Sequence, residues 1–406
     1  MEYTLLSTLY YQDRERYETV YQERFHSDYA VHLDFEVNGN PAFFLQTPEL
    51  YAMLTDILRM NQEVSKLVSI LPAKAISQFT RRCLIDEIVL TNSIEGVRST
   101  RKEISAILDE LEERSRGKRF YGLVKKYTML QTTDELPLES CADIRAIYDE
   151  LVLPEIRAED QTNVPDGKWF RKELVSILSP SQKEIHKGLY PEAKIIHAME
   201  QALAFLHDKS CDILFRLSIF HYLLEYIHPF YDGNGRLGRF ICSYLLSREL
   251  EPVTGYRLSY TVKENIREYN QAFSNCNEPR NRGDLTPFAI MFLRIIQESV
   301  FKLRDSLEDG NTKWNYYTDI IKSSGLIGEG DPFRVYPLYD LLVQATLFSE
   351  NGIQTKIIMD VLDISRGTLT AKLEKIPSGL LVKQKIANTN YYSLDLKALD
   401  EWQKPQ

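Results

Sequence analysis

Twelve consecutive residues, 228–239, combine the residue types that phosphate chemistry requires. The segment reads His-Pro-Phe-Tyr-Asp-Gly-Asn-Gly-Arg-Leu-Gly-Arg. His228 can accept a proton at neutral pH, and Asp232 can hold Mg²⁺, which proteins bind through one or two carboxylates together with substrate phosphates. Arg236 and Arg239 can form charge-assisted bonds to phosphate oxygens. The segment therefore predicts a nucleotide site with a proton acceptor beside it.

Two packed helices must position this segment. Apolar residues recur every three or four positions before it and again after it: Leu214, Leu217, Phe220, Leu224 and Ile227, then Leu237, Phe240, Ile241, Tyr244 and Leu245. Residues 232–235 are therefore expected to form a loop that ends one helix and opens the next. Its glycines allow positive φ and a close approach to a ligand, and the second helix offers unpaired N–H groups to an anion.

Each of these residues alone has a commoner structural role. A histidine at a helix end usually caps the helix or packs in the core, and helical arginines usually form surface ion pairs. Phe230 is expected to pin the loop to the core. The joint occurrence of all of them in one short window favours an active site.

The segment resembles the signature of the Fic family, HPFx[D/E]GNGRxxR, at every defined position. The resemblance implies a protein adenylyltransferase, which transfers AMP from ATP to a Tyr, Thr or Ser hydroxyl of a target protein and releases pyrophosphate. By the same resemblance, His228 would deprotonate the target hydroxyl. Asp232 would bind Mg²⁺ that bridges the α- and β-phosphates.

The resemblance also assigns the phosphate contacts. Asn234 would cradle the phosphates together with the main chain of Gly233 and Gly235, and Arg236 and Arg239 would hold the β- and γ-phosphates. Relatives that transfer phosphate instead of AMP carry lysine where Gly235 stands. The glycine therefore favours AMP transfer.

A second motif precedes the first. Residues 91–96, Thr-Asn-Ser-Ile-Glu-Gly, match the inhibitory motif of the family, [S/T]xxxE[G/N]. Thr91 and Glu95 share one face of a predicted helix that Gly96 ends. The resemblance implies that Glu95 binds Arg239 and denies it to the γ-phosphate. The alternative for Glu95 is a solvated helix-end glutamate. Because this glutamate supports removal of AMP in some relatives, a de-AMPylating or bifunctional enzyme is a second reading.

Two further elements are expected around the site. Apolar runs on either side of a polar stretch predict a β-hairpin at about 173–190. Gly167-x-x-Phe170-Arg171 resembles the segment that leads into the Fic flap, which aligns a target strand through main-chain bonds; a hairpin with only a folding role is the alternative. Tyr269 stands where relatives place an adenine-pocket tyrosine, although a helical tyrosine more often packs.

The C-terminal residues follow a winged-helix order. Predicted helices at 355–362 and 365–374 precede a hairpin at 379–394, and Ser365 is expected to cap the second helix. Residues 351–395 could then contact DNA, with four candidates on the second helix: Arg366, Thr368, Thr370 and Lys372. Eight Lys and Arg against six Asp and Glu in residues 351–406 give only a mild basic bias. The alternative for this module is a protein-contact or dimerising role. The whole protein could then be a DNA-binding or scaffolding regulator.

The predicted fold class is mainly α: an all-helical Fic core with a short β-hairpin flap, plus a C-terminal winged-helix domain. The expected domains are a helical region at 1–117 that carries the inhibitory helix (about 80–96), the Fic core at 118–300, a helical linker at 301–331 and the winged helix at 332–406.

Composition bounds the location of the protein. No apolar run approaches 18 residues, so no membrane span is predicted, and the N-terminus lacks the pattern of a signal peptide. Five scattered cysteines without a CxxC pair favour reduced thiols and a cytoplasmic protein. The net charge of −9 argues against general nucleic-acid affinity. A homodimer is left open, because relatives often dimerise.

Overall fold

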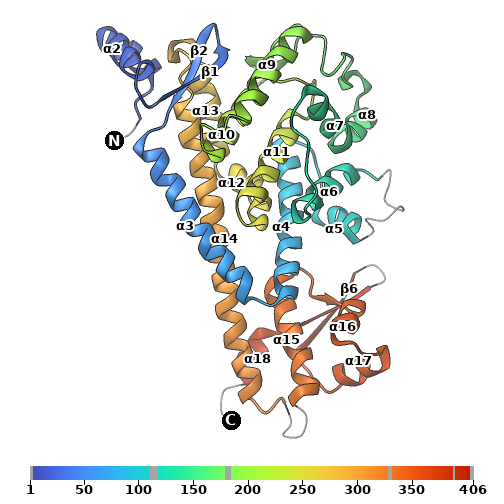
Figure 1. Ribbon diagram of the computed structural model, residues 1–406. Helices are drawn as coiled ribbons and strands as arrows, with labels where there is room; N and C mark the ends of the chain where they lie inside the picture. Colours follow the sequence, from blue (N-terminus) through green and yellow to red (C-terminus); the bar gives the residue numbers. More distant parts are fainter. Residues whose placement is uncertain (1–2, 110–117, 179–183, 328–331, 387–388, 403–406) are drawn as a thin grey trace. The chain divides into compact units, whose positions relative to one another are not determined.

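The computed structural model describes residues 3–109, 118–178, 184–327, 332–386 and 389–402. The fold is mainly helical with small antiparallel sheets, as predicted (Figure 1). The chain divides into two compact units, one formed by Met1–Asn61 and Leu84–Phe301 and the other by Gln62–Cys83 and Lys302–Gln406. Among the described residues, no helix has both the length and the apolar character that crossing a membrane would require.

Helices make up most of the chain as far as residue 323. Their bounds are α1 (Leu6–Gln12), α2 (Arg14–Phe25), α3 (Pro48–Ile70), α4 (Ala73–Ile94), α5 (Arg101–Asp109), α6 (Tyr121–Thr128), α7 (Cys141–Leu151), α8 (Leu153–Glu159), α9 (Glu192–Leu206), α10 (Ile213–Ile227), α11 (Asn234–Glu249), α12 (Leu258–Glu264), α13 (Ile266–Asn277) and α14 (Thr286–Ser323).

Helices α10 and α11 lie in the core of the first unit. Twelve of the fifteen residues of α10 are buried, on every face of the helix. A helix that is apolar all round must be enclosed by other elements. Residues 234–244 of α11 are buried without a break, including Arg236 and Arg239. The loop between these two helices is therefore anchored at both ends by packed structure.

Two short hairpins belong to the first unit. Strands β1 (Ala30–Val37) and β2 (Asn40–Leu45) pair antiparallel around Asn38 and Gly39, which both have positive φ. Such a two-residue Asn-Gly turn matches the twist of a hairpin. This hairpin lies in a region for which only helices were predicted. Strands β3 (Ser176–Leu178) and β4 (Glu184–Lys187) form the second hairpin, within the residues expected for the flap.

Helix α14 runs without interruption through residue 300, where a domain boundary was expected. Its apolar face continues with the buried Leu303 and Leu307. A glycine inside a helix usually costs about 1 kcal/mol. At Gly310, however, a side chain would collide with the ring of Phe348, so close packing explains the glycine.

The C-terminal part of the second unit contains helices α15 (Pro332–Phe348), α16 (Thr355–Leu362), α17 (Arg366–Leu373) and α18 (Leu396–Trp402), with strands β5 (Ile353–Gln354), β6 (Leu381–Ile386) and β7 (Thr389–Leu394). The strands form one antiparallel sheet in the order β5-β7-β6. Ser365 caps α17 by accepting a bond from the Thr368 N–H. The elements stand at the predicted positions, while the winged-helix assignment itself stays a prediction.

Candidate active site

The loop between α10 and α11 is bracketed by two left-handed residues. His228 ends α10 with φ 52°, and Gly233 precedes α11 with φ 82°. A positive φ is uncommon for a residue with a side chain and costs free energy unless its surroundings impose it. Asn234 supplies part of that constraint, because its side-chain amide both accepts from and donates to the main chain of Phe230, each at 2.9 Å.

Phe230 pins the loop to the core. Its ring stacks on Tyr148, with centroids 3.6 Å apart and planes 5° from parallel, and it is fully buried. The Tyr148 hydroxyl also donates to the main-chain oxygen of Asp232. The side chain of Asn234, predicted to touch phosphates, therefore shapes the cradle in this structure.

Asp232 is the loop carboxylate available for a cation. Its Oδ1 accepts from the Gly233 N–H at 2.6 Å, and the residue is partly exposed. Within the described ranges, no group of three or more His, Cys, Asp or Glu could hold a metal ion unaided. One carboxylate fits Mg²⁺ only together with phosphate oxygens and water, which is how nucleotide enzymes usually bind it.

Arg236 is buried and paired with a carboxylate from α8. Its Nη1 lies 2.8 Å from Glu155 Oε2. Burial raises the pKa of Glu155 to about 7, although Arg236 pulls it down. Glu155 also lines a pocket of about 480 Å³ together with Lys118, Arg119 and Lys125.

Arg239 is held by the end of α4. Its Nε donates to the Thr91 hydroxyl at 2.9 Å, and its Nη2 donates to the Thr91 carbonyl at 3.1 Å and to Glu95 Oε1 at 2.7 Å. Burial alone would lower the pKa of Arg239, but the charge and hydrogen bond of Glu95, together with Tyr269 and Glu225, raise it. Arg239 is therefore a buried cation held by Thr91 and Glu95.

Gly235 allows this contact. A Cβ at position 235 would collide with Glu95 Oε1 and would lie 2.9 Å from Arg239 Nη1. Glu95 follows the last residue of α4, and Gly96 turns the chain away with φ 74°. The structure thus places the carboxylate of Glu95 directly over the first turn of α11.

The side chain of His228 is largely buried. Burial, with Arg171 and His186 nearby, lowers its pKa to about 3. Its Nδ1 is 3.9 Å from Glu225 Oε2, one helical turn earlier. Burial and the charge of Glu95 raise the pKa of Glu225 to about 8. The histidine is therefore uncharged at neutral pH, as a proton acceptor must be.

A sequence profile of the Fic/DOC family matches residues 139–246, which include the whole of residues 228–239. This part of the chain is a Fic domain. Over 89% of its length, this chain has a fold similar to that of a Fic family protein from Desulfovibrio desulfuricans, of which it covers 98%, with a TM-score of 0.50 at 19% identity. At this identity the likeness concerns the fold alone.

Two curated relatives match a limited part of this chain. A protein adenylyltransferase Fic of Drosophila ananassae is 32% identical over 96 residues, which is 24% of this chain and 18% of that protein. A probable protein adenylyltransferase of Aquifex aeolicus is 48% identical over 40 residues, which is 10% of this chain and 12% of that protein. The chain therefore spans less than a fifth of either relative.

Tyr269 packs in the core of the first unit. It is buried on α13, its hydroxyl lies 2.6 Å from His221 Nε2, and its ring meets Phe273 edge to face. Burial raises its pKa well above the ordinary tyrosine value. A contact with adenine stays a prediction.

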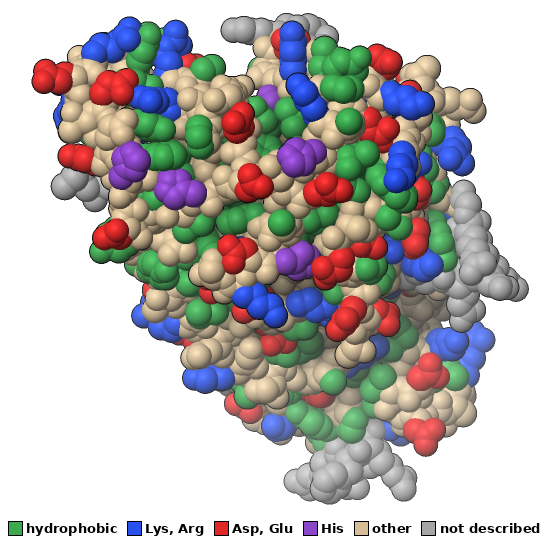
Figure 2. Space-filling model, turned by 45° about the horizontal axis from the view of Figure 1, so that its top comes forward, with side chains coloured by type: hydrophobic (Ala, Val, Ile, Leu, Met, Phe, Trp, Pro, Cys, Tyr) green, Lys and Arg blue, Asp and Glu red, His purple; other side chains and the backbone are tan. Residues whose placement is uncertain are grey.

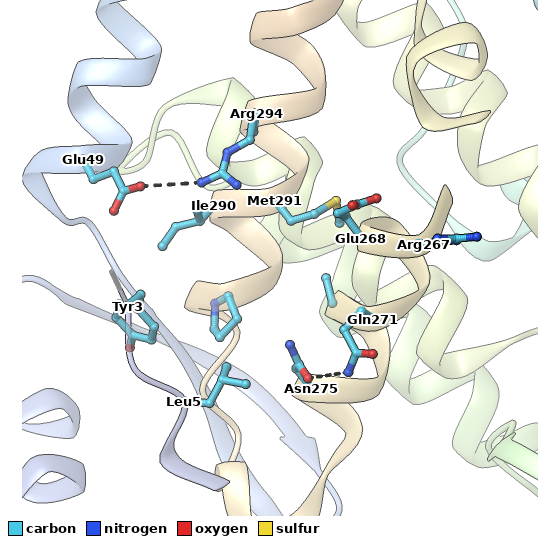
Figure 3. A pocket seen from close by; sticks show the side chains of 12 residues that line it. Tyr3, Leu5, Glu49, Arg267, Glu268, Gln271, Asn275, Ile290, Met291 and Arg294 are labelled. Atoms are coloured by element: carbon cyan, nitrogen blue, oxygen red, sulfur yellow. Dashed lines mark hydrogen bonds and ion pairs between the residues drawn. The ribbon is translucent and has the colours of Figure 1, made fainter. Parts of the chain in front are cut away.

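A separate pocket of about 800 Å³ lies between the N-terminal segment, the start of α3, α13 and α14 (Figure 3). Figure 3 shows Arg294 reaching toward Glu49, 3.8 Å away. Its lining includes no residue of the Fic motif. The pocket is therefore distinct from the loop and helix start at residues 228–239.

Three residues near the Fic motif were not predicted as functional: Glu155, Glu225 and His221. Glu225 stands three residues before His228, so helical spacing placed both on one face. The pair of Glu155 and Arg236 joins residues 81 positions apart and left no local signal in the sequence.

Proposed function

We propose that this protein is an adenylyltransferase that transfers AMP from ATP to a hydroxyl side chain of a target protein, and that Glu95 holds it in an inhibited state. The observation that carries the proposal is the ion pair between Glu95 and Arg239, made over the anion cradle of a Fic motif. The local matches to named adenylyltransferases support the same activity.

The chemistry follows from the charges in the site. The uncharged His228 accepts the proton of the target hydroxyl. The hydroxyl oxygen then attacks the α-phosphorus of ATP, and pyrophosphate leaves. The N–H groups at the start of α11 bind phosphate oxygens with the favourable end of the helix dipole. Asp232 would hold Mg²⁺, which neutralises phosphate charge when bound. Phosphoryl chemistry depends mainly on such positioning and charge neutralisation.

Inhibition is a competition for one guanidinium. The Nε and Nη2 of Arg239 already donate hydrogen bonds to Thr91 and Glu95. A γ-phosphate needs donors of this kind in the same place. Because the Glu95 side chain is 28% exposed while that of Arg239 is 1% exposed, the glutamate can leave while the arginine stays.

The same contact favours a second candidate, removal of AMP from a modified protein. A carboxylate that is partly exposed and lies over the cradle can align a water molecule toward a bound phosphorus. Whether AMP is added or removed, the target segment would pair with the β3–β4 hairpin through main-chain hydrogen bonds.

A DNA contact through the second unit is a further candidate. Arg366, Thr368 and Thr370 are exposed on α17. On the face shown in Figure 2, acidic and basic side chains are interspersed, which gives no extended basic surface there. A gel shift at stated salt tests this candidate, because phosphate contacts weaken as salt rises.

ATP labelled on the α-phosphate, compared with ATP labelled on the γ-phosphate, tests the activity. The protein is incubated with a cell lysate, with and without the Glu95→Gly substitution. Label from the α-phosphate alone should enter protein, and His228→Ala should abolish it. Transfer of the γ-label, or no transfer with either variant, would contradict the proposal.

A further inference from the structure

Arg171 is a fully buried arginine whose side-chain bonds go to main-chain carbonyls. Its Nε donates to the His228 carbonyl at 2.9 Å, its Nη1 to the Glu173 carbonyl at 2.6 Å and its Nη2 to the Leu189 carbonyl at 2.8 Å. Within the residues that the structure describes, it has no carboxylate partner. A buried cation without a counter-ion is costly, so this placement calls for a reason.

The three carbonyls belong to three different segments. Glu173 precedes the flap strand β3, Leu189 follows β4, and His228 is the first residue of the catalytic loop. Main-chain bonds run between the same segments, from Arg171 N–H to the Pro229 carbonyl and from Leu189 N–H to the Ile227 carbonyl. The guanidinium therefore sits where both ends of the flap meet the loop.

Gly188 leaves the room that the guanidinium occupies. A Cβ at position 188 would collide with Arg171 Nη2 and lie 3.1 Å from the Cβ of His228. The N–H of Gly188 donates to the Val175 carbonyl, at the start of the flap. The glycine, the arginine and the histidine are thus packed as one unit.

We propose that Arg171 is a positioning residue for His228, which ties the flap to the catalytic loop and sets both the conformation and the charge state of the histidine. The proposal rests on the function proposed above, in which His228 is the proton acceptor.

The conformational part follows from the bond to the His228 carbonyl. His228 has φ 52°, a left-handed conformation that a residue with a side chain adopts only when its surroundings enforce it. The hydrogen bond from the buried Arg171 guanidinium to the His228 carbonyl fixes the orientation of the peptide group that follows His228. Lysine could not replace the fork, because its single ammonium cannot reach carbonyls on three segments in a fixed plane.

The electrostatic part follows from the groups that face the imidazole. Burial lowers the pKa of His228, and Arg171 and then His186 lower it further, to about 3. His186 lies on β4 and has its own pKa lowered by burial and by Arg171. Glu225, on α10, has its Oε2 3.9 Å from Nδ1, and its pKa is raised to about 8, so its carboxyl is protonated and uncharged over the acid limb. Removing the Arg171 charge should therefore make protonation of His228 easier.

Two substitutions separate the two roles. Arg171→Lys keeps the positive charge but loses the planar guanidinium that bonds the three carbonyls, while Arg171→Met loses both the charge and the guanidinium. Each is made in the full chain with Glu95→Gly, and kcat and KM for AMP transfer are measured against pH. The pKa of His228 is measured independently by NMR. Arg216→Met is the matched control, because Arg216 also donates to main-chain carbonyls, those of Leu206 and Cys211, at the start of α10.

Both Arg171 variants should lower kcat by about 100-fold, the effect of misplacing a reacting group. Only Arg171→Met should raise the pKa of His228 by about one unit or more and move the acid limb of the kcat/KM profile with it. Gly188→Ala, which presses on the guanidinium, should lower kcat less and leave the limb in place. The Arg216→Met control should change neither.

An unchanged pKa of His228 in Arg171→Met would overturn the electrostatic role, and an unchanged kcat in Arg171→Lys would overturn the positioning role. Equal losses in the Arg216→Met control would reduce Arg171 to a general folding residue. If the Glu95→Gly parent shows no transfer, the proposed function fails, while the NMR titration still tests Arg171.

Discussion

Arg239 Nη2 donates to Glu95 Oε1 over 2.7 Å, and a Cβ on Gly235 would collide with the same oxygen. One carboxylate therefore binds the arginine that we propose holds the γ-phosphate, and it covers the first turn of the helix that would bind the phosphates. Arg239 is 1% exposed and is also bonded to Thr91, whereas the Glu95 side chain is 28% exposed, so we expect Glu95 to be the partner that moves.

Thr91→Val should destabilise the first unit. The substitution keeps the shape of the side chain and removes the hydroxyl that accepts from Arg239 Nε. A buried donor left without an acceptor costs about 1–3 kcal/mol. Urea unfolding should show a loss of this size, and Thr91→Ser, which keeps the hydroxyl, should show much less. Equal stability of Thr91→Val and the wild type would contradict the assigned bond.

Gly235→Ala should uncouple Glu95 from Arg239. The methyl group would displace the end of the Glu95 side chain, which can move without a backbone shift. In the parent chain, Glu95→Gly should reduce the free energy of unfolding by about 1–3 kcal/mol, through loss of a charge-assisted bond. In the Gly235→Ala background the same substitution should have less than half that effect. Additive effects in this double-mutant cycle would show that the two positions do not interact.

Stability should fall with rising pH because of Glu225. Burial and Glu95 raise its pKa from 4.5 to about 8, so the native state holds a proton that the unfolded state has lost within this window. The free energy of unfolding then decreases as pH rises through the window, by up to about 1.4 kcal/mol per pH unit from this group.

Glu225→Gln cannot titrate and should flatten that slope. The comparison is made from pH 6.5 to 8.5, where His221 and His228, with pKa values near 3, are already neutral in the native state. Urea unfolding at several pH values measures the slope. Equal slopes in the two proteins would rule out a raised pKa for Glu225.

Much of the site could be predicted because its residues are close in sequence. The loop from His228 to Arg239 lies between two helices whose apolar periodicity is plain, and α10, α11 and the left-handed Gly233 follow from it. The helix that carries Thr91 and ends just before Glu95 followed from spacing in the same way. Its contact with Arg239, 144 residues away, was implied only by the family resemblance.

The unpredicted features depend on tertiary contacts. Glu155 meets Arg236, and Arg171 meets the His228 carbonyl, through packing of segments 81 and 57 residues apart. Arg236, His228 and Arg171 each belong to a local motif, but no local pattern shows which distant residue each of them contacts. The β1–β2 hairpin is different, because Asn38-Gly39 is itself a hairpin-turn signal in the sequence.

The central claim is that Glu95 restrains AMP transfer, and the transfer rate from α-labelled ATP in matched variants tests it most directly. Glu18→Gly is the control, because Glu18 also pairs with an arginine, Arg282, away from the Fic motif. Glu95→Gly should raise the rate about tenfold or more, in line with the loss of a charge-assisted bond, and adding His228→Ala should abolish it. A rate in Glu95→Gly no higher than in the wild type and the Glu18→Gly control would contradict the account.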